Sequence, residues 1–107
     1  MAQPEELVHG YFPLGKVYFS REVADKVDHF VLMNALRYHA NCNWDNLSEQ
    51  DQKDNLAAAK EQRGFVFSKF QHQNISLWIV TDFTTNITTV MFEGEAKDYI
   101  KGRKNNK

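Results

Sequence analysis

By residue type and spacing, the nearest approach to a nucleophilic centre is the set His39, Cys42 and Asp45, in which each residue stands three positions after the one before. A cysteine thiolate becomes a useful nucleophile when a base or a cation lowers the pKa of the thiol, and His39 is a candidate base. The same residues also fit a structural role, with Cys42 partly buried at a helix end and His39 favoured by the helix dipole. We favour the structural role and expect no catalytic residue.

A metal site is not expected either. His39 and Cys42 together supply two ligands, whereas a structural zinc ion needs four and a catalytic zinc ion three. The other histidines, His9, His29 and His72, are scattered along the chain, and the 5 glycines stand apart rather than forming a phosphate-binding loop. The sequence therefore predicts no metal and no cofactor.

Trp44 lies among asparagine and aspartate residues that favour turns. It either fills the gap between the helices and the sheet, which we favour, or presents an aromatic anchor of the kind enriched in binding hot spots. The nearby carboxylates have turn and cap hydrogen bonds as their default role, but a loop folded over a strand end would join them in one polar ring. The candidate partner-binding residues are accordingly Trp44, Asp45, Asp51, Asn55 and Asp82.

A long helix is expected to position the first of these residues. Apolar side chains recur at helical spacing from residue 21 to about residue 39, directly after Ser20, whose hydroxyl can cap the first turn. This pattern predicts one central core helix that packs across a sheet face. The expected core side chains, two of them from a later strand, are Val27, Phe30, Val31, Leu36, Trp78 and Ile79.

A second helix is expected from residue 49 to about residue 62. Ser48 stands three residues before Asp51, which approximates the capping box found at helix N-termini. The helix is mostly polar, so its main core-facing residues are expected to be Leu56 and Ala59.

After Gly64, the expected cap of the second helix, the apolar pattern changes to a period of two, which is typical of strands. The expected strands are residues 14–19, 65–70, 75–83 and 87–92, the last three forming a meander. We therefore predict an α+β fold in the order β-α-α-β-β-β, with two helices on a three- or four-stranded antiparallel sheet. Residues 1–107 are interpreted as a single domain, with a loose lead-in at 1–10 and a mobile basic tail at about 96–107.

The composition argues against several classes of partner. The chain has 13 basic and 14 acidic residues and a net charge of −1, whereas a nucleic-acid-binding protein usually carries a basic excess. Its apolar runs are shorter than the ~18 residues of a membrane span, and the first residues lack the pattern of a secretory signal. The single Cys42 suits a reducing compartment. We expect a cytoplasmic protein whose partner is another protein.

Residues 42–45 and 78–89 contain two short motifs, Cys-Asn-Trp-Asp and Trp-Ile-Val-Thr-Asp followed by Thr-Thr. Both resemble motifs of a family of small uncharacterised plasmid- and phage-related proteins. Residues 42–45 read Cys-Asn-Trp-Asp, where that family typically has a Gly-Asp-Trp-Gly turn. Residues 78–82 read Trp-Ile-Val-Thr-Asp, followed by Thr-Thr-Asn and then Thr-Thr at 88–89, similar to the family's Trp-Ile-Ile-Thr-Glu strand and hairpin. The resemblance covers about half of the chain and implies a mobile-element setting rather than an activity.

These observations predict a non-enzymatic accessory factor of a mobile genetic element, acting by binding a host or element-encoded protein. Inhibition of a host defence system is the most concrete version and is implied by the resemblance alone. One alternative is a small hydrolase or ligand-binding domain that uses the polar ring around Trp44. Another is a structural subunit that pairs with a second copy of itself.

Overall fold

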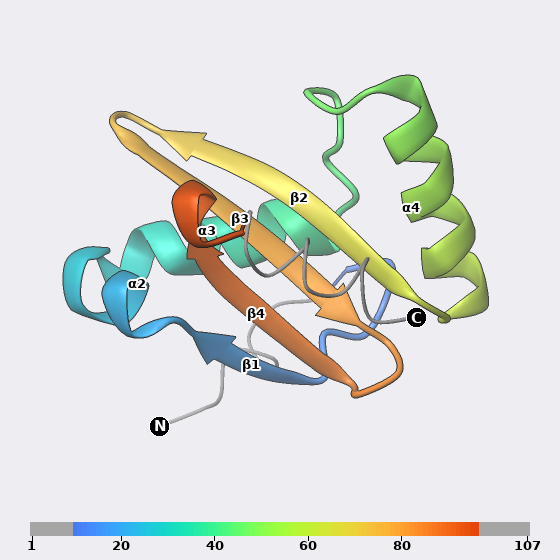
Figure 1. Cartoon of the computed structure of the whole chain (residues 1–107), viewed down its shortest axis with the longest axis horizontal. Coiled ribbons are helices and arrows are strands. Elements are labelled where there is room, and N and C mark those ends of the chain that lie inside the picture. Colours follow the sequence, from blue (N-terminus) through green and yellow to red (C-terminus); the bar gives the residue numbers. More distant parts are fainter. Residues whose placement is uncertain (1–9, 97–107) are drawn as a thin grey trace.

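The computed structural model describes residues 10–96 and confirms the expected α+β class (Figure 1). The lead-in and the tail predicted from the sequence lie outside the described residues, apart from Gly10 and Ala96. The elements follow the order β1 (Lys16–Phe19), α2 (Arg21–Lys26), α3 (His29–Ala40), α4 (Glu49–Glu61), β2 (Phe65–His72), β3 (Ile75–Asp82) and β4 (Ile87–Phe92).

The four strands form one mixed sheet in the order β1-β4-β3-β2. β2, β3 and β4 make the expected antiparallel meander, but β1 pairs with β4 in parallel, from Lys16 opposite Ile87 to Phe19 opposite Val90. The prediction of a purely antiparallel sheet is therefore wrong in this respect. After β1 the chain passes through α2, α3 and α4 and enters the sheet at its far edge, and a long crossover of this kind permits parallel pairing.

The long helix predicted for residues 21–39 is two helices. Val27 ends α2 with extended backbone angles, φ −107° and ψ 132°. Asp28 then caps α3, its Oδ1 accepting a hydrogen bond of 2.8 Å from the backbone N–H of Phe30. A short aspartate side chain competes for backbone donors in this way, and it begins a new helix instead of continuing the old one.

This break changes which side chains reach the core. Phe30 is 78% exposed, so the expectation that it is buried is wrong, because it lies in the first turn of α3 rather than in the middle of one long helix. The other expected core residues are buried or partly buried: Val27, Val31, Leu36, Trp78 and Ile79.

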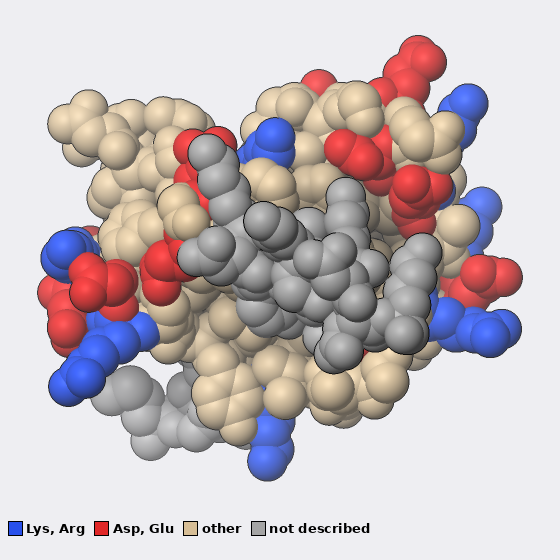
Figure 2. All heavy atoms as spheres, viewed as in Figure 1, with Lys and Arg blue, Asp and Glu red and all other residues tan. Residues whose placement is uncertain are grey.

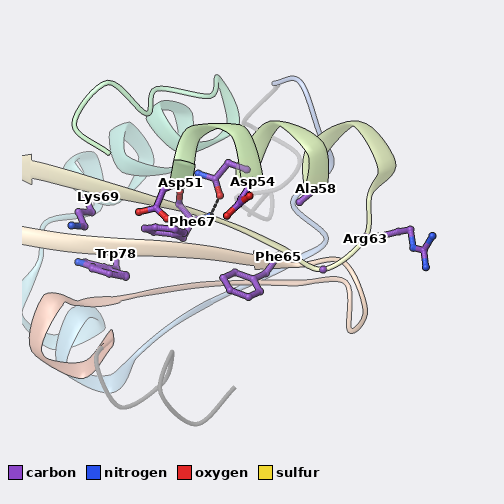
Figure 3. Close-up of a pocket in the computed structure, with 10 residues that line it drawn as sticks. Asp51, Asp54, Ala58, Arg63, Phe65, Phe67, Lys69 and Trp78 are labelled. Atoms are coloured by element: carbon purple, nitrogen blue, oxygen red, sulfur yellow. Dashed lines mark hydrogen bonds between the residues drawn. The ribbon is translucent and has the colours of Figure 1, made fainter. Parts of the chain in front are cut away.

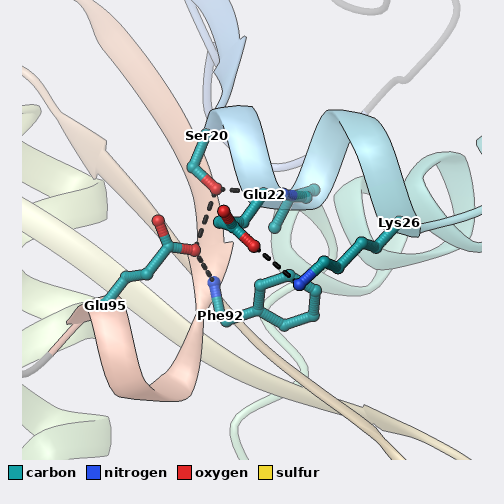
Figure 4. A network of polar contacts seen from close by, with 6 residues as sticks. Ser20, Glu22, Lys26, Phe92 and Glu95 are labelled. Carbon is teal, nitrogen blue, oxygen red and sulfur yellow. Dashed lines mark hydrogen bonds and ion pairs between the residues drawn. The ribbon is translucent and has the colours of Figure 1, made fainter.

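Glu95 joins the end of β4 to the beginning of α2 (Figure 4). Its Oε1 accepts hydrogen bonds from the Ser20 hydroxyl at 2.9 Å and from the Phe92 N–H at 3.0 Å. The Ser20 oxygen in turn accepts from the Val23 N–H at 3.2 Å, which is the cap predicted from the sequence. α2 is thereby held against the strand that runs beside β1.

α4 begins as predicted, with the Ser48 hydroxyl accepting from the Asp51 N–H at 3.1 Å. It ends at Gln62, which has a left-handed backbone with φ 52°, and not at the glycine expected to cap it. Leu56 is 46% exposed, contrary to prediction, while Asn55 and Ala59 face inward. The reason is that α4 lies along the edge of the sheet beside β2 and not over an apolar face.

Two asparagine side chains form hydrogen bonds with the backbone of β2, which is an edge strand of the sheet. Asn55 Nδ2 donates to the Phe67 carbonyl at 2.8 Å, and the Phe67 N–H donates to Asn55 Oδ1 at 3.2 Å. Two residues further along the strand, Asn46 Nδ2 donates to the Lys69 carbonyl at 2.9 Å. The amide of Asn55 therefore satisfies both backbone groups of Phe67, as a neighbouring strand would.

Candidate functional site

The side chains that could have formed a nucleophilic centre do not pair with one another in the structure. His39 is completely buried, with Nδ1 at 2.7 Å from Ser68 Oγ and Nε2 at 2.8 Å from Thr81 Oγ1. Both ring nitrogens are thus engaged with the sheet and not with Cys42. Burial lowers the pKa of His39 to about 3 and raises the pKa of the Cys42 thiol. Both shifts oppose the formation of a thiolate–imidazolium pair.

The protons in this buried cluster can be assigned by following the hydrogen bonds from one end. Thr88 Oγ1 donates to the Leu14 carbonyl at 2.5 Å, so its single proton is used there. Thr81 Oγ1 must then donate across the 2.6 Å contact to Thr88 Oγ1, and must accept from His39 Nε2–H. It follows that Nδ1 accepts from the Ser68 hydroxyl. The chain therefore runs in one direction through a neutral imidazole.

This cluster is a structural element. It links α3 to β2, β3, β4 and the segment that precedes β1, and its four side chains, those of His39, Ser68, Thr81 and Thr88, are at most 1% exposed. Within residues 10–96, no three histidine, cysteine or acidic side chains come together as metal ligands.

The residues of the predicted polar ring do not meet. Trp44 is 6% exposed and packs in the core, which is the role favoured from the sequence, while Asp45 is exposed. Asp82 is buried at the end of β3 and accepts from the Thr84 N–H at 2.9 Å. Only Asp51 and Asn55 line a common groove, and their neighbours there come from β2 and β3.

This groove lies between α4 and the sheet face opposite α3 and has a volume of about 430 Å³ (Figure 3). That volume falls within the roughly 300–1,000 Å³ typical of ligand sites. We call it the aromatic groove and define it by Asp51, Asp54, Phe65, Phe67, Lys69 and Trp78.

The floor of the aromatic groove is a stack of two rings on neighbouring strands. Phe67 of β2 and Trp78 of β3 have ring centroids 5.2 Å apart and planes only 15° from parallel. Lys69 is the cross-strand partner of Trp78, and its ammonium lies 5.1 Å from the centroid of the Trp78 ring. All three side chains are partly buried, so part of the floor is accessible.

The wall of the aromatic groove is acidic. Asp51 and Asp54, three residues apart on one side of α4, project toward the floor, whereas Arg63 points away from it (Figure 3). Asp54 Oδ1 accepts from Gln50 Nε2 at 2.8 Å, but Lys26 and Glu22 form the one ion pair found within residues 10–96. Acidic side chains also gather over α4 on this face of the molecule (Figure 2). No basic side chain in the described part of the chain therefore neutralises the wall carboxylates by a direct ion pair.

Sequence reasoning missed most of this site. It assigned Trp78 to the core and did not single out Lys69 or Asp54. The available signal was the alternation in residues 65–70, which places Phe65, Phe67 and Lys69 on one face. The position of α4 beside that face could not be read from the alternation.

No protein-family model, curated protein or solved structure matches this chain. The resemblance to plasmid- and phage-related proteins therefore stays a prediction. No helix within the described part of the chain is long and apolar enough to cross a membrane.

Proposed function

We propose that the protein is a non-enzymatic factor that acts by binding another protein, with the aromatic groove as its contact surface. The observation that carries this proposal is the partly accessible Phe67–Trp78 stack beside two carboxylates that form no ion pair with any residue from 10 to 96. Tryptophan is enriched among the residues that dominate binding energy, which lie near the centre of an interface where surrounding contacts exclude water. The floor lies on paired strands, so little ordering is needed on binding.

A mobile-element setting and inhibition of a host defence system complete the proposal. Both derive from the motif resemblance at residues 42–45 and 78–82. A host nuclease or another defence component is accordingly the first partner to test.

Partner capture tests the proposal when it is compared across matched variants. The tagged full-length protein and two groove variants, Trp78→Ala and Asp54→Lys, are incubated with host extract, and retained proteins are identified by mass spectrometry. Phe30→Ala is the control, because Phe30 is a 78% exposed aromatic residue on α3, outside the groove. Circular dichroism of each variant checks that the fold is kept.

The wild-type and Phe30→Ala proteins should retain the same partner, and both groove variants should lose it. Asp54→Lys is informative because Asp54 is exposed, so a charge reversal there leaves the core untouched. Capture that is equal in all four proteins would contradict the proposal. So would recovery of nucleic acid alone, with an affinity that falls steeply as salt rises.

A small-molecule ligand is the second candidate, and the volume of the groove favours it. A thermal-shift screen of small cationic and aromatic compounds separates the two candidates. A stabilising compound whose effect disappears in Trp78→Ala, together with no captured protein, would support the small ligand.

A further inference from the structure

We propose that the aromatic groove receives an arginine side chain from a basic segment of the partner protein. The inference rests on the proposed function, because it specifies the chemistry of the partner at the same surface. It follows from the aromatic rings of the floor, from the carboxylates of the wall and from their position side by side.

The floor already holds a cation. The ammonium of Lys69 lies 5.1 Å from the centroid of the Trp78 ring, within the range at which the negative face of an aromatic ring attracts a positive charge. Phe67 is stacked nearly parallel to Trp78 on the side toward α4, so its ring presents a second aromatic face. The floor thus offers an aromatic surface larger than one lysine covers.

The wall has the opposite charge to an arginine. Asp51 and Asp54 face the floor, and Lys69 is the one basic side chain of the groove that lies over it, since Arg63 points away (Figure 3). Two carboxylates against one ammonium leave the groove acidic. A phosphate or carboxylate ligand would meet like charges on the wall, whereas a cation would complete the pairing.

Arginine fits this combination better than lysine does. Its guanidinium is planar, so it can stack on a ring while its edge donates two parallel hydrogen bonds to a carboxylate. The aromatic groove provides ring faces and a carboxylate wall side by side. An ammonium group can use either feature but has no flat face to stack, so the geometry favours a guanidinium.

Fluorescence of Trp78 provides a direct test with short peptides. The chain has 2 tryptophans, and Trp44→Phe leaves Trp78 as the single reporter. The Trp44 indole nitrogen has no hydrogen-bond partner within residues 10–96, so phenylalanine removes no hydrogen bond there. The probes are capped tetra-arginine, tetra-citrulline, tetra-lysine and tetra-glutamate peptides. Citrulline keeps the shape of arginine but lacks its charge.

Tetra-arginine should bind at least about tenfold more tightly than tetra-citrulline, as expected for a charge-assisted pair. Asp51→Asn combined with Asp54→Asn should abolish that difference. Asp45→Asn should leave it unchanged, since Asp45 is exposed and does not line the groove.

Equal binding of arginine and citrulline peptides would overturn the inference, as would lysine binding as tightly as arginine or a preference for glutamate. Partner capture lost in Trp78→Ala but intact in the Asp51→Asn, Asp54→Asn double variant would also overturn it, while leaving the proposed function in place. Partner capture that is unchanged in all groove variants would instead contradict the proposed function.

Discussion

The two faces of the sheet differ in how far their polar side chains are buried and hydrogen-bonded. On the face covered by α3, the side chains of Ser68, His39, Thr81 and Thr88 form a buried chain of hydrogen bonds that ends at the Leu14 carbonyl. On the opposite face, beside α4, the polar groups of the aromatic groove are only partly paired and are open to solvent. A polar cluster that is buried and fully satisfied specifies the fold, whereas one that is accessible and incompletely paired is available to a partner.

The largest expected effect concerns pH and the buried face. The pKa of His39 is about 3 in the folded protein against 6.5 for an unperturbed histidine, so the unfolded state binds the extra proton between these values. The stability contributed by the neutral ring is complete above pH 6.5 and falls as the pH drops toward 3, by about 5 kcal/mol in total at 1.36 kcal/mol per unit. Urea unfolding measured from pH 7 to pH 4 tests this slope.

A His39→Gln protein, which cannot take up that proton, should lose this component of the pH dependence. If wild type and variant changed in parallel with pH, His39 would not be the group responsible. That result would also contradict the difference drawn between the buried polar cluster around His39 and the solvent-accessible aromatic groove.

A threonine on each face provides the next comparison. Thr81→Val on the buried face leaves His39 Nε2–H without an acceptor and should destabilise the protein by about 1–3 kcal/mol. Thr89→Val, on the opposite face of the neighbouring strand, should change stability by less than about 0.5 kcal/mol. Chemical denaturation of both variants gives the difference, and equal losses would refute the distinction between the faces.

The smallest effect is expected for Phe30, which belongs to neither face. At 78% exposure, Phe30→Ala should shift the free energy of unfolding by less than about 0.5 kcal/mol. A core phenylalanine would instead cost about 3–5 kcal/mol. A loss of that size in a melting experiment would show that Phe30 is buried, as the single long helix predicted from the sequence requires.

The parts of the fold that could be predicted are those fixed by local patterns. Alternation gave β4 its limits at Ile87–Phe92, and hydroxyl caps at Ser20 and Ser48 marked the starts of α2 and α4. The break before α3 was missed because apolar spacing continues through Asp28, and a cap inside a periodic stretch gives no separate signal. The parallel pairing of β1 depends on contacts across the whole chain.

The candidate site was less predictable for a related reason. Asp51 and Asn55 were named, but their neighbours in the groove are set by where α4 docks. This helix docks through Asn55 and Ala59 and not through a long apolar stripe. Trp44, an obvious residue in the sequence, is a core residue in the structure. Rare residue types attract attention, but accessibility depends on the tertiary fold.

The asparagine contacts to β2 also set the size of the sheet. A bare edge strand can recruit a strand from another molecule and start a growing polymer. Asn55 occupies both backbone groups of Phe67, and at the other end of the sheet β1 is only 4 residues long. Helix α4 therefore blocks the addition of a further strand at this edge. Its detachment would expose the backbone of β2 to strands of other molecules.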